Sequence, residues 1–515
     1  MNSKTKTLIV CVVMAMAGAI LFFGQSDQER NGGWAHSVLR NWGEYGFFKL
    51  QGRMITNPGG YSVLEDPQYY TGHRPHVLRA AYFIGCLTGN PGYEGWLFQA
   101  LLSALVGWAI WKGLGQSLAA FLVAFCTVVS PGFIRHSLIL DTLAIPALLG
   151  IPFVVLSALL LRKERLKLAD WICLLVLCVV YTSINWTTGM ALVVAFAYFV
   201  TSANFKLGRI VALFAAAGVS AAIVLAVSVL DKRSGDASAA HALVALYNNY
   251  LFGPGGYGNI PMDWVTATRR ILVANIMALA PLIFAAGFVV SASSWRTTFS
   301  IVTLLPLLAS LACVAFFRNY FATHPWMAAP VIILGCIATL FSWYDRSQIN
   351  LGLNAAITKA TMTLISLLAL AYSPLVSQIY QLYSSGNAAS IKSMLRTNTE
   401  RADIVFCDQS VLDDGIAVDW LESGCDRKFL LWDGNPDATV PGSNARLFLL
   451  TTNIDSAVGV LVANSNVPVV SVAGLLHAPL EWYRAKVARR DAREVPKPSA
   501  TYYLLELPPA ATVGE

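Results

Sequence analysis

Charged residues are scarce in this sequence. They make up 13% of its 515 residues, whereas hydrophobic residues make up 56% and the mean hydropathy is +0.57. About a quarter of the residues of a typical soluble domain are charged. The scarcity of charge therefore excludes a soluble globule of this length and predicts a polytopic membrane protein.

Compact metal-binding motifs are also missing. The chain contains no H-E-x-x-H pair and no clustered D-x-D, so we expect no dedicated metal site, although histidines and carboxylates elsewhere could still hold a divalent cation. No internal repeat is evident either, and transporters usually show paired halves with polar sites near the bilayer midplane. The absence of a repeat argues against a transporter. We also expect no nucleic-acid partner.

Long apolar runs are what the sequence has in abundance. A membrane-crossing helix needs about 20 mostly apolar residues, and we predict eleven such spans. "AMA" at Ala15–Ala17 resembles a signal-peptidase site, but the apolar run continues through "GAILFF", which favours an uncleaved anchor. The predicted spans are Thr7–Phe23, Glu94–Trp111, Gln116–Val129, Asp141–Leu161, Ala169–Ser183, Thr187–Ser202, Ile210–Leu230, Ile271–Ser291, Phe299–Phe316, Met327–Trp343 and Ala360–Val376.

Basic connectors predict the orientation, because Lys and Arg are enriched on the cytoplasmic side. If the spans alternate from an inside N-terminus, the basic connectors all fall on that side: Lys4 and Lys6, Arg162–Lys167, Phe205–Arg209, Arg296 and Arg346. Residues 24–93, 231–270 and the tail from about Ser377 would then lie outside. We expect a membrane domain over 1–376, including the outer loop 24–93, and an extracytoplasmic domain over 377–515.

The tail differs from the rest of the chain. Short β-rich runs such as "ADIVFCD", "RKFLLWD" and "TYYLLELPP" alternate with helix-like stretches such as "DSAVGVLVANSN", a pattern typical of a small α/β unit. Seven of the nine cysteines lie in or beside apolar spans. The other two, Cys407 and Cys425, could form a disulfide in an oxidising exterior.

All seven histidines fall on the predicted outer side or at an outer helix end. The set includes His36, His73, His76, His136 and His324. Interfacial His, Trp and Tyr can simply anchor helix ends, and this explanation suffices for any one of them. Taken with their charged neighbours, the set favours an outward-facing polar pocket, because polar groups at membrane depth tend to face a cavity or a partner.

Asp141 lies inside an otherwise apolar run, shortly after Arg135 and His136. A carboxylate in a membrane span is a candidate functional residue. An Asp ahead of "TLAIP" can also satisfy free backbone donors as the N-cap of a helix. Position alone leaves both interpretations open.

Four segments in order cover much of the membrane region: "HSVLRNWGEYGFF" (His36–Phe48), "YYTGHRPHVLRAAYFIGCLTG" (Tyr69–Gly89), "SPGFIRHSLILDTLAIP" (Ser130–Pro146) and "RNYFATHPWMAAP" (Arg318–Pro330). Together they resemble the GT-C superfamily of glycosyltransferases, which use polyprenyl-phosphate sugars and include the lipid A aminoarabinose transferases and the protein O-mannosyltransferases.

The resemblance implies roles for particular residues. Arg74 would hold the lipid phosphate, and Asp141 matches the acidic residue beside the early spans. The chain departs from the family in the first loop, where the expected acidic position falls on Asn31, with Glu29 close by. Either Glu29 is the first-loop base, or this chain uses the segment "NGGWAH" differently.

The chemistry of the transfer points to the same residue types. A lipid phosphate is a stable anionic leaving group that benefits from fixed positive charge, and the guanidinium fork of Arg matches phosphate geometry. The incoming hydroxyl needs a carboxylate to orient it or accept its proton. The candidates are Asp141 and Glu29 for catalysis, Arg74, His73, Arg318 and His324 for the donor phosphate, and His36, Arg135, His136 and Tyr70 as further pocket residues.

The sequence thus predicts an α-helical membrane glycosyltransferase with a small α/β tail. It would transfer a sugar from a polyprenyl-phosphate donor to a lipid, glycan or protein acceptor of the cell envelope, as in lipopolysaccharide or polysaccharide modification. The site and tail would face outward from the cytoplasmic (inner) membrane of a bacterium, among membrane lipids. A lipid-linked glycan ligase or polymerase is the first alternative, and a transporter is the second.

Overall fold

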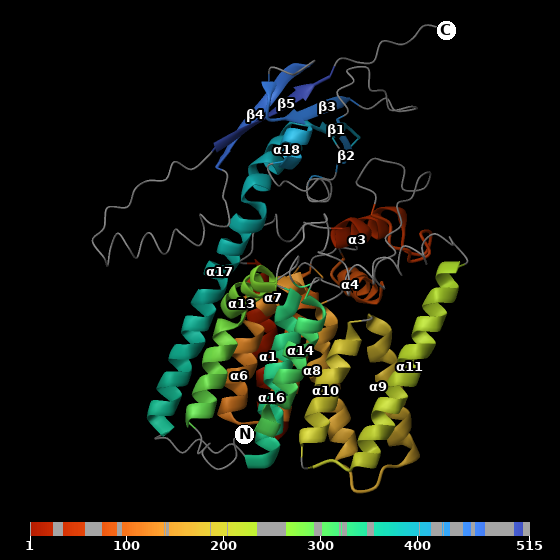
Figure 1. The fold of residues 1–515 in the computed structure, drawn as a ribbon, viewed down its shortest axis with the longest axis vertical. Coiled ribbons are helices and arrows are strands. Elements are labelled where there is room, and N and C mark those ends of the chain that lie inside the picture. The colour runs from red at the N-terminus through yellow and green to blue at the C-terminus, as the bar shows by residue number, and fades with distance from the viewer. Residues whose placement is uncertain are drawn as a thin grey trace. The chain divides into compact units, whose positions relative to one another are not determined.

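The computed structural model divides into two compact units (Figure 1). The first comprises Met1–Gln25, Thr71–Asn90 and Glu94–Val376, and the second comprises Ser26–Tyr70, Pro91–Tyr93 and Ser377–Glu515. The structure describes residues 2–23, 34–56, 75–89, 95–138, 140, 144–185, 187–202, 204–233, 264–292, 301–318, 321, 327–347, 355–400, 402–413, 425, 427–432, 446–454, 459–468 and 499–507.

The first unit is helical in its described residues. Its elements are α1 (Ser3–Phe23), α4 (His76–Leu87), α5 (Trp96–Gly113), α6 (Leu118–Val128), α7 (Pro131–Leu138), α8 (Ile145–Leu161), α9 (Leu168–Ile184), α10 (Thr188–Thr201), α11 (Leu207–Arg233), α13 (Trp264–Ala292), the 3₁₀ turn η2 (Ile301–Leu304), α14 (Leu305–Phe316), α16 (Ala328–Ser347) and the first half of α17 (Ala355–Asn398).

Each of the eleven predicted spans contains a helix, so the helical nature of these segments is confirmed. By length and composition, three described helices can cross a membrane, within α1, α13 and α16, or four if the bent pair α6–α7 counts as one span. Seven further apolar helices in the described residues are shorter. The count of eleven spans is therefore not confirmed.

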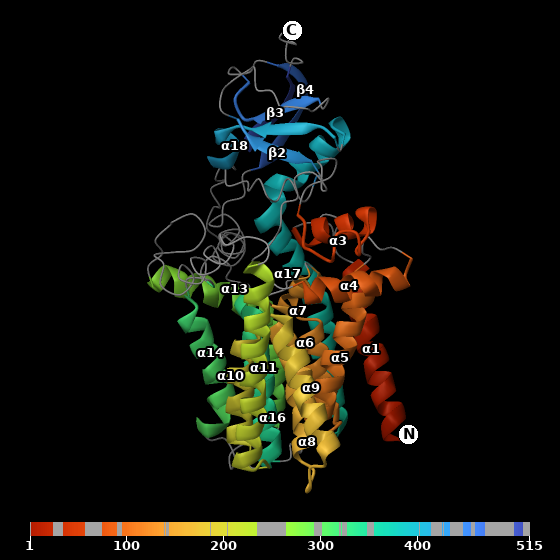
Figure 2. The ribbon, with the colours of Figure 1, turned by 90° about the vertical axis from the view of Figure 1, so that its right-hand side faces the viewer.

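A polar cluster joins the ends of α8, α10 and α16, three helices of the first unit that pack against one another (Figures 1 and 2). The Asp345 carboxylate, near the end of α16, lies 2.5 Å from the Arg162 guanidinium that follows α8. It also accepts hydrogen bonds from Tyr198 Oη at 2.9 Å and Ser202 Oγ at 2.7 Å, at the end of α10. One buried carboxylate thereby ties α8, α10 and α16 together.

Two more arginines close the same end. Arg346 donates from Nε and Nη2 to the Thr201 carbonyl, which ends α10. Arg209 donates to the carbonyls of Leu161, Lys163 and Glu164, where α8 ends. The last carbonyls of a helix lack partners within it, so these cations satisfy them. Three of the predicted basic groups therefore lie at one end of the unit, as the alternation of spans predicts. They are residues 162–167, residues 205–209 and Arg346.

The second unit contains a five-stranded sheet with the order β2-β1-β3-β5-β4. Its strands are β1 (Ile404–Cys407), β2 (Lys428–Leu431), β3 (Leu447–Thr451), β4 (Val460–Pro468) and β5 (Ser499–Glu506), and α18 (Gln409–Asp413) follows β1. β1 pairs with β2 and β3 in parallel, whereas β5 pairs antiparallel with β3 and β4. The expected combination of strands and helices in the tail is observed.

The prediction of a helix for "DSAVGVLVANSN" is wrong over its described part. Residues 455–458 lie outside the described residues, but Val460–Pro468 is strand β4, which pairs with β5 from one end to the other with a bulge between Leu461 and Ala463. The side chains of Val460, Leu461 and Val462 are exposed on this edge strand. Long-range pairing with β5 decides the conformation, and β-branched valines suit a strand. The periodicity of a single segment does not reveal such a partner.

The second half of α17 packs against one face of this sheet. Ile391, Met394 and Leu395 share a buried cluster with Val405, Cys407, Phe429 and Leu450. Cys425 belongs to the same cluster, and neither Cys407 nor Cys425 is bonded to another cysteine. The conditional prediction of a Cys407–Cys425 disulfide is therefore not borne out. Burial is the main factor that raises the pKa of the Cys407 thiol to about 12, so this thiol is protonated at neutral pH.

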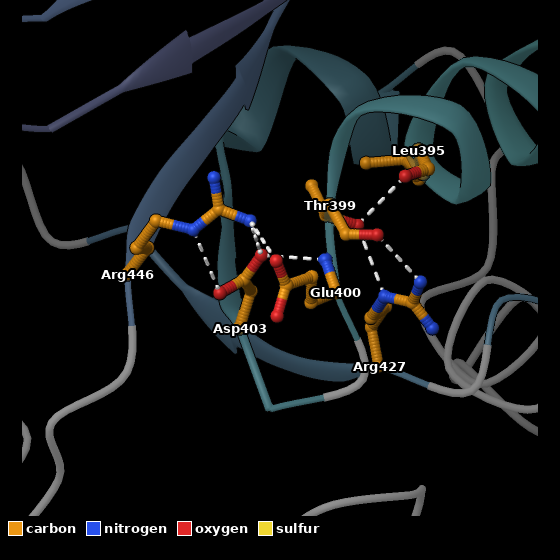
Figure 3. Close-up of polar contacts among 6 residues, drawn as sticks. All are labelled: Leu395, Thr399, Glu400, Asp403, Arg427 and Arg446. Carbon is orange, nitrogen blue, oxygen red and sulfur yellow. Dashed lines mark hydrogen bonds and ion pairs between the residues drawn. The ribbon is translucent and has the colours of Figure 1, made fainter.

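Paired charges close the amino ends of the parallel strands (Figure 3). Arg446 Nη2 lies 2.8 Å from Asp403 Oδ2, and Asp403 also accepts from the Glu400 N–H at 2.6 Å. Buried Arg427 donates to Thr399 Oγ1 and to the Thr399 carbonyl, just past the end of α17. These contacts fix the end of α17 against the starts of β1, β2 and β3.

Candidate functional site

Six of the ten predicted site residues lie outside the described residues, so the roles assigned to them stay predictions. The other four are described: His36 in α3 (Trp34–Tyr45), Arg135 and His136 in α7, and Arg318 after α14. The six outside the description are Glu29, Tyr70, His73, Arg74, Asp141 and His324.

A bent pair of helices leads toward the predicted carboxylate. α6 and α7 meet at 55°. Pro131 begins α7, where its missing N–H costs no hydrogen bond, and Ser130 precedes it. The Ser130 hydroxyl donates to the Thr127 carbonyl at 2.7 Å, and Ser373 Oγ of α17 donates to the Val129 carbonyl. Hydroxyls thus satisfy backbone groups that the break leaves without helical partners, as a break inside a membrane protein requires.

α7 is packed tightly along its first turn. A Cβ atom added to Gly132 would lie 2.9 Å from Ala329 Cβ of α16 and 3.3 Å from Ala278 Cβ of α13, so only glycine fits without a shift. His136, one turn further on, is fully buried and Arg135 is half-buried. Cations in the last turn also complement the helix dipole. The fold therefore holds two basic side chains at the closed end of an apolar helix.

Leu140 turns the chain directly before Asp141. Its side chain is fully buried and its φ is 50°, a left-handed conformation that is uncommon for a leucine and costs energy. α8 begins at Ile145 with Ala144 as its N-cap residue and no side-chain cap. The alternative interpretation of Asp141 as the N-cap of this helix is therefore wrong, because Asp141 lies three residues before the cap position.

Arg318 lies between two anchored aromatic residues. Phe321 is buried and Phe317 packs beside it in a cluster that includes Met190 of α10 and Val331 of α16. Both α14 and α7 contact α16. α7, which carries Arg135 and His136, and α14, which ends two residues before Arg318, thus pack on one shared helix.

His36 belongs to the other compact unit. It lies in α3, where it is 7% exposed. Burial, followed by the nearby Arg40 cation, lowers the pKa of its imidazole to about 4. His36 is therefore neutral at pH 7 and supplies no positive charge for a phosphate.

The two first-loop motifs have local structural explanations. In "EYG", Gly46 ends α3 with a φ of 90°, which glycine adopts freely, while Asn41 and Trp42 donate to the carbonyls of Ile55 and Arg53. In "HRPH", α4 begins at the last residue, His76, with Pro75 as its N-cap residue.

Sequence reasoning missed Gln99 of α5. Its side chain is fully buried, and among the described residues neither amide atom has a hydrogen-bond partner. A single Gln between apolar residues gives no periodic signal, so only packing reveals it.

As for metals, the described residues contain no group of three His, Cys, Asp or Glu side chains that could hold one.

The described arrangement suits an anionic ligand near the start of α8. Two basic residues of α7 and the turn at Leu140 precede the acidic position 141 in the chain, and Arg318 follows α14, which contacts the same helix as α7. Positive groups fixed in an apolar, water-poor environment stabilise negative charge more strongly than they do in water.

No protein-family model matches the chain, and no curated protein matches it. Among solved structures, it is similar to the arabinofuranosyltransferase AftD from Mycobacteria, with 15% identity and a TM-score of 0.46 over 83% of this chain. The chain spans 32% of the length of that protein. It is also similar to an oligosaccharyltransferase of Archaeoglobus fulgidus, with 14% identity and a TM-score of 0.43, over 86% of this chain and 67% of the other.

Both names belong to glycosyltransferases, the class that the sequence motifs resemble. TM-scores below 0.5 do not establish a common fold, so the assignment of function rests on this chain's own residues.

Proposed function

We propose that the protein is a membrane glycosyltransferase that moves a sugar from a polyprenyl-phosphate donor to a cell-envelope acceptor. The acceptor is a lipid, a glycan or a protein on the outer face of a bacterial cytoplasmic membrane. The observation that carries the proposal is the break between α6 and α7, with Arg135 and His136 held before the strained turn at Leu140 and Asp141 immediately after it.

In this proposal, the donor phosphate binds to the basic residues. Arg74 and Arg318 neutralise the charge that develops on the leaving phosphate, with His73 and His324 as hydrogen-bond donors and Arg135 and His136 as further pocket residues. His36 is neutral at pH 7 and does not take part as a cation.

Asp141 accepts the proton of the incoming hydroxyl, or orients that hydroxyl, at the outer end of α8. Glu29 is the second candidate for this step. Because the leaving phosphate is already a stable anion, the reaction needs little general acid. The step is then a direct displacement at the sugar carbon, in which the acceptor oxygen forms a bond as the sugar–phosphate bond breaks.

Sugar transfer by the full chain in lipid nanodiscs tests this proposal. The donors are a panel of polyprenyl-phosphate and polyprenyl-diphosphate sugars, and the acceptor is a cell-envelope extract. We expect transfer from a monophosphate donor, lost in both Arg74→Ala and Asp141→Asn. Transfer from diphosphate donors alone would indicate a ligase or polymerase, and solute flux in liposomes without any transfer would indicate a transporter.

A matched control comes from the other end of α8. Arg165 is exposed on the connector after α8, and this helix of 17 residues separates it from Asp141 by about 25 Å. Arg165→Ala removes one positive charge far from the proposed site. It should keep the wild-type transfer rate, whereas an equal loss in this variant would point to general damage by charge removal.

A further inference from the structure

A row of side chains crosses the sheet of the tail. Cys407 of β1 pairs with Leu431 of β2 and with Leu450 of β3 in the parallel registers. The residues that come next along these three strands therefore lie side by side: Asp408, Trp432 and Thr451. Thr451 in turn pairs with Tyr503 of β5. We call Trp432, Asp408, Thr451 and Tyr503 the carboxyl-edge row.

The row lies on one face of the sheet. Side chains alternate between the faces of a strand, and Phe406, Leu449 and Leu505, each two residues from a member of the row, form one buried cluster with Trp432 and Tyr503 packed against it. The rings of Phe406 and Trp432 are 5.4 Å apart. This face is opposite to the one that packs on α17, because Cys407 and Leu450 point to the α17 side.

The members of the row are held in place. Thr451 Oγ1 donates to Asp408 Oδ2 at 2.6 Å, and Ser410 Oγ donates to the same oxygen at 3.1 Å. The Thr452 N–H donates to Ser410 Oγ. Asp408, Trp432 and Tyr503 are half-buried, whereas Thr451 is fully buried. The carboxylate is therefore oriented, and both aromatic residues retain accessible surface.

The topology places the row at the position where open α/β sheets bind ligands. β1 connects to β2 on one side of itself and the chain then crosses to β3 on the other side, so the order reverses at β1. Ligands of such sheets bind outside the carboxyl ends of the strands at this reversal. Asp408 and Thr451 lie at the carboxyl ends of β1 and β3.

The two edges of the parallel strands differ in charge pairing. At the amino edge, Asp403 is matched by Arg446 (Figure 3). At the carboxyl edge, the partners of Asp408 within the described part of the tail are hydroxyls, with no cation among them. An oriented carboxylate with remaining acceptor capacity binds a donor-rich ligand.

We propose that the carboxyl-edge row is a saccharide-binding site. Sugar hydroxyls donate to Asp408, and the flatter apolar faces of sugar rings lie on Trp432 and Tyr503. Strands are about 4.8 Å apart, so the two aromatic residues are separated by about 14 Å across three strand spacings. This separation fits an extended oligosaccharide, whereas a cage for a single cation needs its rings within about 6 Å of one point.

The site goes beyond the proposed transfer reaction, because none of its four residues has a role in that reaction. That the bound saccharide belongs to the acceptor is a step that rests on the proposed function. Binding to the row itself is independent of transfer and can be measured without any donor.

Saturation-transfer NMR on the full chain in nanodiscs tests the site. The probes are linear tetrasaccharides of glucose, mannose, galactose and N-acetylglucosamine, their monosaccharides, and tetralysine. We expect at least one tetrasaccharide to bind, more tightly than its monosaccharide. Trp432→Ala should weaken this binding about tenfold or more, as truncation of a central aromatic contact does, and Trp432→Phe should restore much of it.

Two variants separate binding from folding. Leu431→Ala changes the exposed neighbour of Trp432 on the opposite face and should leave the affinity unchanged. Asp408→Asn keeps the shape of the side chain and should weaken binding while leaving the melting temperature close to that of the wild type. Absence of binding by every saccharide, equal affinity of Trp432→Ala and wild type, or binding of tetralysine in place of sugars would each overturn the proposal.

Discussion

His36 shows how burial sets the charge of a single residue. Its imidazole is almost completely buried in α3, next to the cation of Arg40, and its pKa falls to about 4. An unfolded histidine has a pKa of about 6.5. Between these values the unfolded chain binds a proton that the folded chain does not, so the stability due to His36 is present above pH 6.5 and is lost as the pH falls toward 4.

The first prediction concerns this pH dependence. Each pKa unit corresponds to about 1.4 kcal/mol, so His36 should account for about 3 kcal/mol of stability lost between pH 6.5 and pH 4. Thermal unfolding of wild type and His36→Gln, measured at intervals over that range, should show a flatter pH profile in the variant. Identical profiles would mean that His36 titrates normally in the folded chain.

Gln99 is the second residue whose burial has a measurable consequence. Both its amide atoms are buried without a partner among the described residues, and such groups lose hydration without compensation. Gln99→Leu, which has a similar volume, should stabilise the protein by about 1–2 kcal/mol. Gln99→Asn keeps the amide and should give no gain. A lower melting temperature for Gln99→Leu would show that the amide has a partner.

At the scale of elements, the packing of α8, α10 and α16 depends on a carboxylate that hydropathy does not identify. Asp345 ends an apolar run and is nearly buried, yet it contacts Arg162, Tyr198 and Ser202 from two other helices. The basic connectors themselves were predictable from composition. Their partners were not, because contacts between residues more than a hundred positions apart depend on the packing of whole helices.

Asp345→Asn should therefore loosen this end of the bundle. The variant loses an ion pair and weakens two hydrogen bonds, which we expect to cost about 1–2 kcal/mol because Arg162 is 38% exposed and can regain water. Thermal unfolding in detergent, together with hydrogen exchange at the ends of α10 and α16, measures the effect. Arg165→Ala is the control, and an equal effect in both variants would contradict a specific role for Asp345.

The strands show a similar limit. β1, β2, β3 and β5 follow runs that the sequence marks as β-rich, but β4 was expected to be helical and is paired with β5. The same long-range pairing creates the carboxyl-edge row, whose four residues come from positions 408 to 503. No local motif connects these residues, so the row could not be predicted before the sheet order was known.

At the scale of the whole molecule, composition predicted the helices of the membrane region because long apolar runs are local signals. The site was only partly predictable. The motif around Arg135, His136 and Asp141 directed attention to the start of α8, but the 55° break, the Ser373 contact and the turn at Leu140 arise from packing. His36 was grouped with that site from sequence order, yet it lies in the other compact unit.

The central claim is that the carboxylate after the turn at Leu140 acts on the acceptor hydroxyl. The most direct test is the rate of sugar transfer by Asp141→Asn relative to Arg165→Ala, measured in nanodiscs under identical donor and acceptor concentrations. We predict a rate at least about 100-fold lower for Asp141→Asn, as expected for loss of a general base, and an unchanged rate for Arg165→Ala. Near wild-type transfer by folded Asp141→Asn would contradict the claim.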